Sequence, residues 1–221
     1  MANIFTSSIG KKVIMSISGL FLILFLVLHM SLNITSIFSE ETFQQVCDFM
    51  ALPIVSILVP VLAFGFVIHI VYAFILTLGN IRARGGYNRY AVSNKAPTDS
   101  WASRNMVVLG IIVALGLVLH LTHFWADMQL AEWMGGESAN PNELMASTFG
   151  NIWITLLYLI WFAAIWFHLT HGFWSAFQSI GLSNTIWFKR LKVIGIVIVT
   201  AIMGGFALTA IYAYLKANGI V

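Results

Sequence analysis

Residues 11–36 read KKVIMSISGLFLILFLVLHMSLNITS, in which two lysines precede a long apolar run with one histidine, His29, in its second half. A helix needs about 20 mostly apolar residues to cross the hydrocarbon core of a bilayer. The run is too long for the apolar region of a secretory signal, and no A-x-A cleavage pattern follows it. We therefore interpret this stretch as a membrane helix that stays in the mature protein.

The rest of the chain has the same character. Of 221 residues, 60% are hydrophobic and only 9% are charged, whereas a soluble domain carries about a quarter charged residues. The sequence predicts an all-α membrane protein in which residues 1–221 form one domain, a bundle of five transmembrane helices. The expected spans are about 13–36, 52–78, 104–126, 151–178 and 192–215. Tryptophan, methionine and acidic residues alternate within 128–149, which predicts a short interfacial helix there.

The charged residues predict how the bundle is oriented. Every Lys and Arg except Lys216 lies before the first span, around the loop between spans two and three, or around the loop between spans four and five. Every Asp and Glu except Asp99 lies in the two opposite loops. By the positive-inside rule, the N-terminus is cytoplasmic and the C-terminus is outside. The pI of about 9.1 then reflects topology, and we expect no nucleic-acid binding.

Histidine supplies the titratable chemistry inside the predicted spans. All six histidines lie there, and the central regions of the spans contain no Asp, Glu, Lys or Arg. Ionisable groups at this depth are functional candidates by default, although each histidine could instead hydrogen-bond a neighbouring helix. The single cysteine, Cys47, excludes an internal disulfide, a thiolate zinc cluster, a Cys-ligated iron–sulfur cluster and a CxxCH haem attachment. A metal in this protein would therefore be held by histidine.

Four histidines fall at two depths. At a rise of about 1.5 Å per residue, His29 and His120 both lie roughly 25 Å from the basic start of their spans. Spans two and four run the other way, so His69 and His168 share a level nearer the cytoplasm. The two levels are about 15 Å apart in a span of about 30 Å. Hydrogen bonding between helices does not predict such pairing.

Two imidazoles from facing helices at one level provide bis-histidine ligation of a haem iron. Two levels predict two b haems stacked across the membrane. With both axial positions filled by protein, the expected role is electron transfer. Zinc fits less well, because the deep regions offer no carboxylate or thiolate companions.

The H-x-x-H pairs His120/His123 and His168/His171 leave the choice of ligand open. Residues three apart lie on one helix face, about a turn from each other, so either member could bind iron. The spare histidine could pack, orient a ligand, contact a propionate or contact a quinone.

Four runs around these histidines resemble the di-haem cytochrome b membrane-anchor subunit of succinate dehydrogenase and fumarate reductase. They are SGLFLILFLVLHMSLN (18–33), FVIHIVYAF (66–74), LVLHL (117–121) and FHLTHGFWSAFQSIGL (167–182). The resemblance implies that His29 and His120 bind a distal haem and that His69 and His168 bind a proximal haem. Gly172 and Gly181 follow His168 at the family's spacings, which favours His168 over His171.

The resemblance also implies a complex in the inner (cytoplasmic) membrane of a bacterium. A flavoprotein with covalent FAD and an iron–sulfur protein would dock on the cytoplasmic side, and this chain would exchange electrons with membrane quinone, usually menaquinone. The chain would belong to an oxidoreductase while the dicarboxylate active site lies on a partner subunit. Ser16, Ser18 and the loop from Arg82 to Arg104 would face that partner and the proximal propionates, unless the serines bond their own helix backbone.

One position departs from the family. Some relatives carry a glutamate two residues before the helix-four ligand, and here that position is Trp166. In those relatives the glutamate is part of a transmembrane proton route, so the departure argues against such a route here. Asp127, Gln129 and Glu132 could serve a quinone near the distal haem or could simply end a helix in water.

Two other functions remain open from the sequence. One is a di-haem anchor for another quinone-linked dehydrogenase. The other is a haem-free transporter or scaffold, for which Pro60, Gly204 and Gly205 are the only hints of broken spans.

Overall fold

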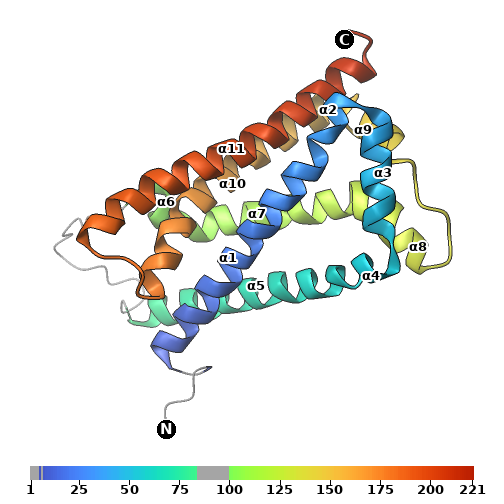
Figure 1. The fold of residues 1–221 in the computed structure, drawn as a ribbon. Coiled ribbons are helices and arrows are strands. Elements are labelled where there is room, and N and C mark those ends of the chain that lie inside the picture. The colour runs from blue at the N-terminus through green and yellow to red at the C-terminus, as the bar shows by residue number, and fades with distance from the viewer. Residues whose placement is uncertain (1–4, 6, 84–99) are drawn as a thin grey trace.

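The computed structural model describes residue 5, residues 7–83 and residues 100–221, and every regular element in these ranges is a helix (Figure 1). Arg84, Arg89 and Lys95, which contribute to the orientation argument, lie outside the described residues. The elements are α1 (Ser8–Asn33), α2 (Thr35–Phe38), α3 (Glu40–Ala51), α4 (Pro53–Ser56), α5 (Leu58–Ala83), α6 (Trp101–Arg104), α7 (Met106–His120), the π-helical segment η1 (Leu121–Leu130), α8 (Ala131–Trp133), α9 (Pro141–Phe149), α10 (Ile152–Ser179) and α11 (Thr185–Ala217).

Five helical stretches in the described ranges are long and apolar enough to cross a membrane. They are Ser8–Phe38, Pro53–Ala83, Met106–Trp133, Ile152–Ser179 and Thr185–Ala217. The all-helical, five-span architecture expected from the sequence is therefore confirmed. The chain is a multi-pass membrane protein by the length and composition of its helices.

Capping residues set the helix ends more sharply than hydropathy does. The Ser7 side chain accepts from the Gly10 amide at 3.1 Å and starts α1 before residue 13. Asn184 accepts from the Ile186 and Trp187 amides and starts α11 before residue 192. Such caps satisfy amides that have no partner within the helix. Polar residues between cap and apolar core therefore extend these helices beyond the expected spans.

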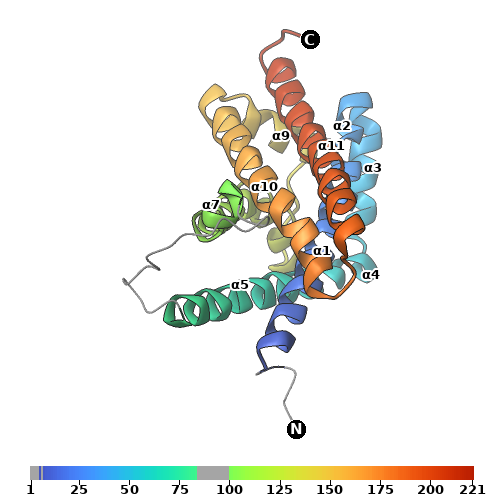
Figure 2. The same cartoon turned by 90° about the vertical axis from the view of Figure 1, so that its left-hand side faces the viewer.

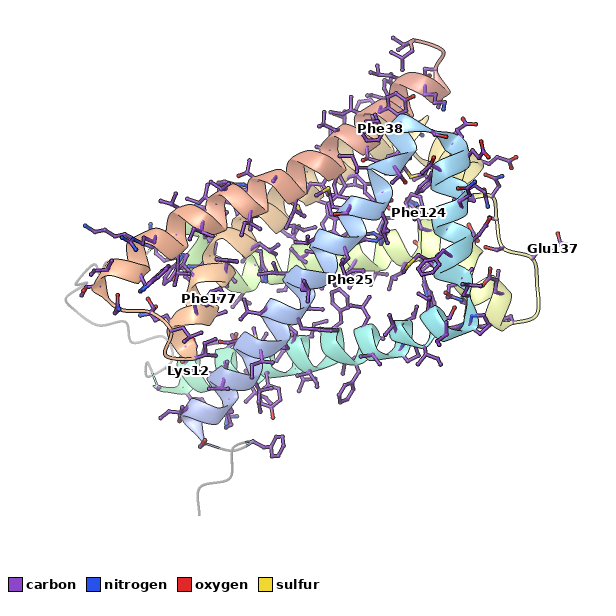
Figure 3. The ribbon with its side chains drawn as sticks, in the orientation of Figure 1. Lys12, Phe25, Phe38, Phe124, Glu137 and Phe177 are labelled. Atoms are coloured by element: carbon purple, nitrogen blue, oxygen red, sulfur yellow. The ribbon has the colours of Figure 1, made fainter. Side chains whose placement is uncertain are left out.

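The charges gather at two ends of the bundle. The basic end holds the start of α1, the end of α5 and the start of α11; the acidic end holds α3, α8 and α9. Figure 3 shows Lys12 and Glu137 at these opposite ends. At the acidic end, Lys216 pairs with Glu40 at 2.7 Å, and Asn142 donates to the Glu40 carbonyl at 3.2 Å. These contacts tie the end of α11 and the start of α9 to α3, a helix that the hydropathy pattern did not predict.

The long helices do not all pack equally. α10 lies along α11, α1 packs against both, and α7 packs against α10, whereas α5 packs mainly against α1. Figure 2 shows α5 set apart from α7, α10 and α11. Glycines allow close approach in the packed part, because a Cβ at Gly195 would meet Phe173 and one at Gly205 would meet Met30. The separation of α5 from α7 and α10 positions the site described next.

Candidate functional site

A large cavity lies inside the bundle between α5 and the helices α1, α7 and α10. Its volume is about 1920 Å³, whereas small-molecule pockets usually measure about 300–1,000 Å³. Five of the six histidines line it: His29, His69, His120, His168 and His171. The cavity is thus large enough for more than one bulky apolar ligand.

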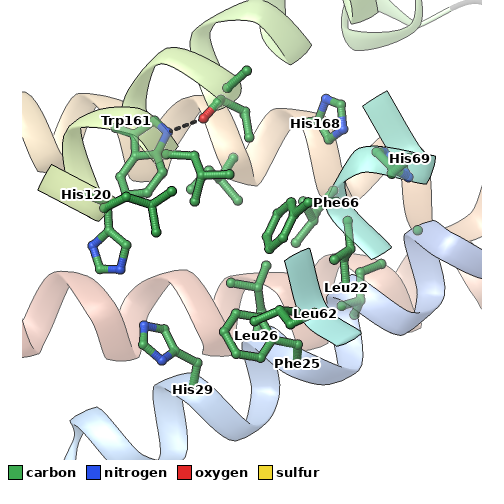
Figure 4. A pocket seen from close by; sticks show the side chains of 18 of the residues that line it. Leu22, Phe25, Leu26, His29, Leu62, Phe66, His69, His120, Trp161 and His168 are labelled. Atoms are coloured by element: carbon green, nitrogen blue, oxygen red, sulfur yellow. Dashed lines mark hydrogen bonds between the residues drawn. The ribbon is translucent and has the colours of Figure 1, made fainter. Parts of the chain in front are cut away.

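His29 of α1 and His120 of α7 face each other toward the acidic end. Their ring centroids are 5.8 Å apart and the rings are inclined at 80°. Aromatic side chains enclose both imidazoles. Phe25 stacks on His29 at 5.2 Å, and Trp161 lies 5.9 Å from His120. The indole N–H of Trp161 donates to the Val113 carbonyl at 3.1 Å, which fixes the indole beside His120 (Figure 4).

His69 of α5 and His168 of α10 face each other toward the basic end, with ring centroids 6.3 Å apart and rings inclined at 66°. Figure 4 shows this pair and the His29–His120 pair at opposite ends of the cavity, with Leu26, Leu62 and Phe66 between them. The structure therefore brings together the two histidine pairs that the depth argument predicted. Their role as iron ligands stays a prediction.

The spacing of the rings fits haem ligation. With metal–imidazole bonds of about 2 Å and roughly 1 Å from nitrogen to ring centre, two imidazoles on opposite faces of one iron lie about 6 Å apart. The ring separations of 5.8 and 6.3 Å agree with this value. Within the described ranges no three His, Cys, Asp or Glu residues converge, as a metal site built from protein ligands alone would require. A haem iron needs only two protein ligands, because the porphyrin supplies the others.

The surroundings of the His69–His168 pair have two further features. The Nδ1 atom of His168, like that of His171, is buried without a hydrogen-bond partner, so this feature does not distinguish the two histidines. Glycine stands beside each ring: a Cβ at Gly19 would lie 3.3 Å from His69, and one at Gly110 would lie 3.7 Å from His168. The backbone thus leaves room around both imidazoles.

Ser18 contacts the imidazole of His69. Its hydroxyl donates to the Met15 carbonyl at 3.0 Å, and its oxygen lies 3.3 Å from Nδ1 of His69. With its hydroxyl hydrogen directed at the Met15 carbonyl, the serine oxygen can accept from an Nδ1–H group of His69. The Nε2 lone pair of His69 is then available for a metal, an arrangement typical of histidine ligands. Ser18 therefore bonds its own helix backbone, which was one of the two alternatives from the sequence, and it also contacts His69, which the sequence did not predict.

Asn33 is the neighbour of His29. Its amide nitrogen donates to the His29 carbonyl at 2.8 Å and lies 3.4 Å from His29 Nδ1, a long contact for a hydrogen bond. Asn33 thus holds the last turn of α1 beside the pair rather than fixing the imidazole as Ser18 does.

The two remaining histidines differ in position. His123 is absent from the cavity lining, and its Nδ1 lies 3.1 Å from the Tyr158 hydroxyl. His171 lines the cavity at the basic end, stacks edge-on against Trp174 at 4.8 Å, and has a buried Nδ1 without a partner. Geometry therefore favours His120 over His123. It favours His168 over His171 because only His168 pairs with a histidine on a facing helix.

Polar side chains line both ends of the cavity. At the basic end they include Lys12, Ser16, Ser103, Arg104, Gln178 and Ser179. At the acidic end Gln129 and Glu132 reach the lining, whereas Asp127 does not. The Oε1 atom of Gln44 is buried there without a partner. Burial, reinforced by Asp48, raises the pKa of the nearby Cys47 thiol to about 11, which keeps it neutral.

The sequence did not predict the aromatic side chains around His120 or the π-helical segment. Tyr158, Trp161 and Phe124 surround His120, and only the spacing of Tyr158 and Trp161 on one helix face could have signalled this. The change from α to π geometry after His120 has no signal in the hydropathy pattern.

Comparison of the chain with protein-family models, with curated proteins and with solved structures finds no match in any of the three. The assignment of a function therefore depends on the site and on the resemblance described above.

Proposed function

We propose that this chain is the membrane-anchor and electron-transfer subunit of a succinate:quinone oxidoreductase. The observation that carries the proposal is the pairing of four histidines from four helices across one apolar cavity. Bis-histidine sites between helices of a bundle are typical of b-type cytochromes. The choice of this family over other cytochromes rests on the sequence resemblance.

Each histidine has a specific role in this proposal. His29 and His120 hold one b haem, and His69 and His168 hold the other; these groups, when bound, supply one-electron transfer without an open coordination position. Ser18 keeps His69 in the tautomer that ligates through Nε2. The aromatic wall around His29 and His120 excludes water and surrounds the site with a medium of low polarity.

The remaining assignments follow from the charge arrangement and the resemblance. The basic end faces the cytoplasm and receives the iron–sulfur protein and the FAD-containing flavoprotein, which carries the dicarboxylate site. The chain exchanges electrons with a quinone, which is usually menaquinone in this family, within the cytoplasmic membrane of a bacterium. The clustering of Lys12, Arg82, Arg104 and Lys189 at one end supports this orientation.

A reduced-minus-oxidised spectrum with haem quantitation on the purified membrane complex tests the haem assignment. We expect two low-spin b haems per chain. His69→Ala and His168→Ala should each remove one haem, and His29→Ala and His120→Ala should each remove the other. His123→Ala is the matched control and should retain both. A wild-type complex without haem would contradict the proposal, as would loss of a haem in His123→Ala but not in His120→Ala.

The partner assignment needs a separate experiment. A tagged form of the chain, purified from its native membrane, should bring with it a polypeptide with covalent flavin and an iron–sulfur protein, and succinate should reduce its haems. Reduction by formate or hydrogen, with no response to succinate, would instead identify the anchor of another quinone-linked dehydrogenase.

A further inference from the structure

His123 has a partner that connects it to the candidate ligand His120. The Nδ1 atom of His123 lies 3.1 Å from the hydroxyl of Tyr158 on α10, and the two rings stack with centroids 5.9 Å apart and an inclination of 24°. Only 2% of Tyr158 is exposed. A buried phenol hydroxyl needs a hydrogen-bond partner, and His123 is the partner that the described structure provides.

Tyr158 in turn lies against His120. Its ring meets the His120 imidazole edge-on, with centroids 6.4 Å apart and an inclination of 72°. Phe149 and Trp161 contact other edges of the same phenol ring at 5.0 and 5.7 Å. The Tyr158 ring is therefore tightly packed beside His120. Its hydroxyl is the polar atom of the side chain, and it contacts His123, which lies outside the cavity lining.

The π-helical segment places His123 where it can reach this hydroxyl. η1 begins at Leu121, directly after His120, and π turns are wider than α turns. His120 and Phe124 line the cavity, but His123 between them does not. A π segment at this point thus separates the two histidines of the H-x-x-H motif into different surroundings.

We propose that His123 is a positioning residue: through Tyr158 it fixes the orientation of the His120 imidazole plane. The proposal rests on the proposed function, because it assigns His120 as an axial ligand. Partners one step removed from a metal commonly orient its ligands, and here the orienting contact is a ring rather than a hydrogen bond to the ligand itself. Loss of the His123–Tyr158 bond, by either substitution, removes the polar contact that holds the ring of residue 158 in place, so this ring shifts and the imidazole turns with it.

Electron paramagnetic resonance of the oxidised complex measures this orientation, since the signal of a low-spin ferric haem depends on the angle between its two axial imidazole planes. The signal that disappears in His29→Ala is assigned to the haem at the acidic end. His123→Leu and Tyr158→Phe should each shift that signal, and the double variant should shift it no further than either single change. His123→Gln, which retains hydrogen-bonding capacity, should restore most of the wild-type signal.

The haem held by His69 and His168 provides the internal control, and its signal should stay unchanged in all of these variants. An unshifted signal in both His123→Leu and Tyr158→Phe, with two haems retained, would overturn this inference but would leave the proposed function unaffected. Equal shifts at both haems would overturn it too, because they would indicate general loosening. Loss of a haem in His123→Leu with retention in His120→Ala would make His123 the ligand. A wild-type complex without haem would instead overturn the proposed function itself.

Discussion

At the scale of single residues, the four paired histidines differ in how firmly their surroundings hold them. His69 is oriented by one hydroxyl, that of Ser18, whereas His120 is enclosed by Phe124, Tyr158 and Trp161. A hydrogen bond fixes both the tautomer and the ring direction of a histidine. The two pairs should therefore respond to different kinds of substitution.

We expect Ser18→Ala to weaken haem binding at His69. The substitution removes the oxygen that accepts from Nδ1, and loss of such a partner commonly lowers metal affinity about 10–100-fold. Haem content after purification at limiting haem supply measures the effect. Ser31→Ala is the matched control, because Ser31 lies on the same helix, is exposed and bonds only the Val27 carbonyl. Equal haem content in Ser18→Ala and Ser31→Ala would show that Ser18 merely bonds its own backbone.

At the scale of helices, hydropathy and depth along the spans predicted the long helices, but the sequence did not predict the positions of the caps and turns. The five spans follow from apolar length, and the pairing of His29 with His120 and of His69 with His168 follows from a fixed rise per residue. The starts of α1 and α11, the helix α3 and the π segment did not follow, because they depend on single capping side chains and on local backbone geometry. Ser39 before Glu40 was a usable signal for α3.

Two glycine substitutions should differ in effect, because Gly116 of α7 lies in the contact with α10 whereas Gly204 of α11 faces open space. A Cβ at Gly116 would overlap the Trp161 indole, which lies beside His120, whereas nothing lies within 4 Å of a Cβ at Gly204. Gly116→Ala should destabilise the protein by about 1–3 kcal/mol through overpacking. Gly204→Ala should be neutral or should stabilise α11 by up to about 1 kcal/mol through helix propensity.

Thermal unfolding of both variants in one detergent checks this prediction. The midpoint for Gly116→Ala should fall below that of the wild type, and the spectrum of the haem at the acidic end should change with it. A lowered midpoint for Gly204→Ala and an unaltered one for Gly116→Ala would contradict the packing described for α7 and α10.

At the scale of the whole molecule, the separation of charge predicts which end faces the cytoplasm. In a Cys47→Ala background, a membrane-impermeant thiol reagent added to intact cells should label Glu137→Cys and leave Lys189→Cys unlabelled, since both positions are exposed but lie at opposite ends. Both positions should label after the membrane is opened with detergent. Labelling of Lys189→Cys alone in intact cells would reverse the assigned orientation.

The loose packing of α5 predicts that a bound haem contributes to the tertiary structure. α5 packs mainly against α1 and is joined to α10 across the cavity by the His69–His168 pair. The helices α1 and α7, which carry the other pair, both pack directly against α10. Loss of the haem between His69 and His168 should therefore free α5 more than loss of the other haem does.

Hydrogen exchange on detergent-solubilised variants measures this difference, because amide protection reports local opening. Peptides from Leu58–Ala83 should exchange faster in His168→Ala than in His29→Ala, while peptides from Thr185–Ala217 should stay protected in both. His168→Ala leaves the sequence of α5 intact, so faster exchange there reports the lost connection to α10 rather than a change in α5 itself. Equal exchange of α5 in the two variants would mean that its contact with α1 is sufficient to hold it.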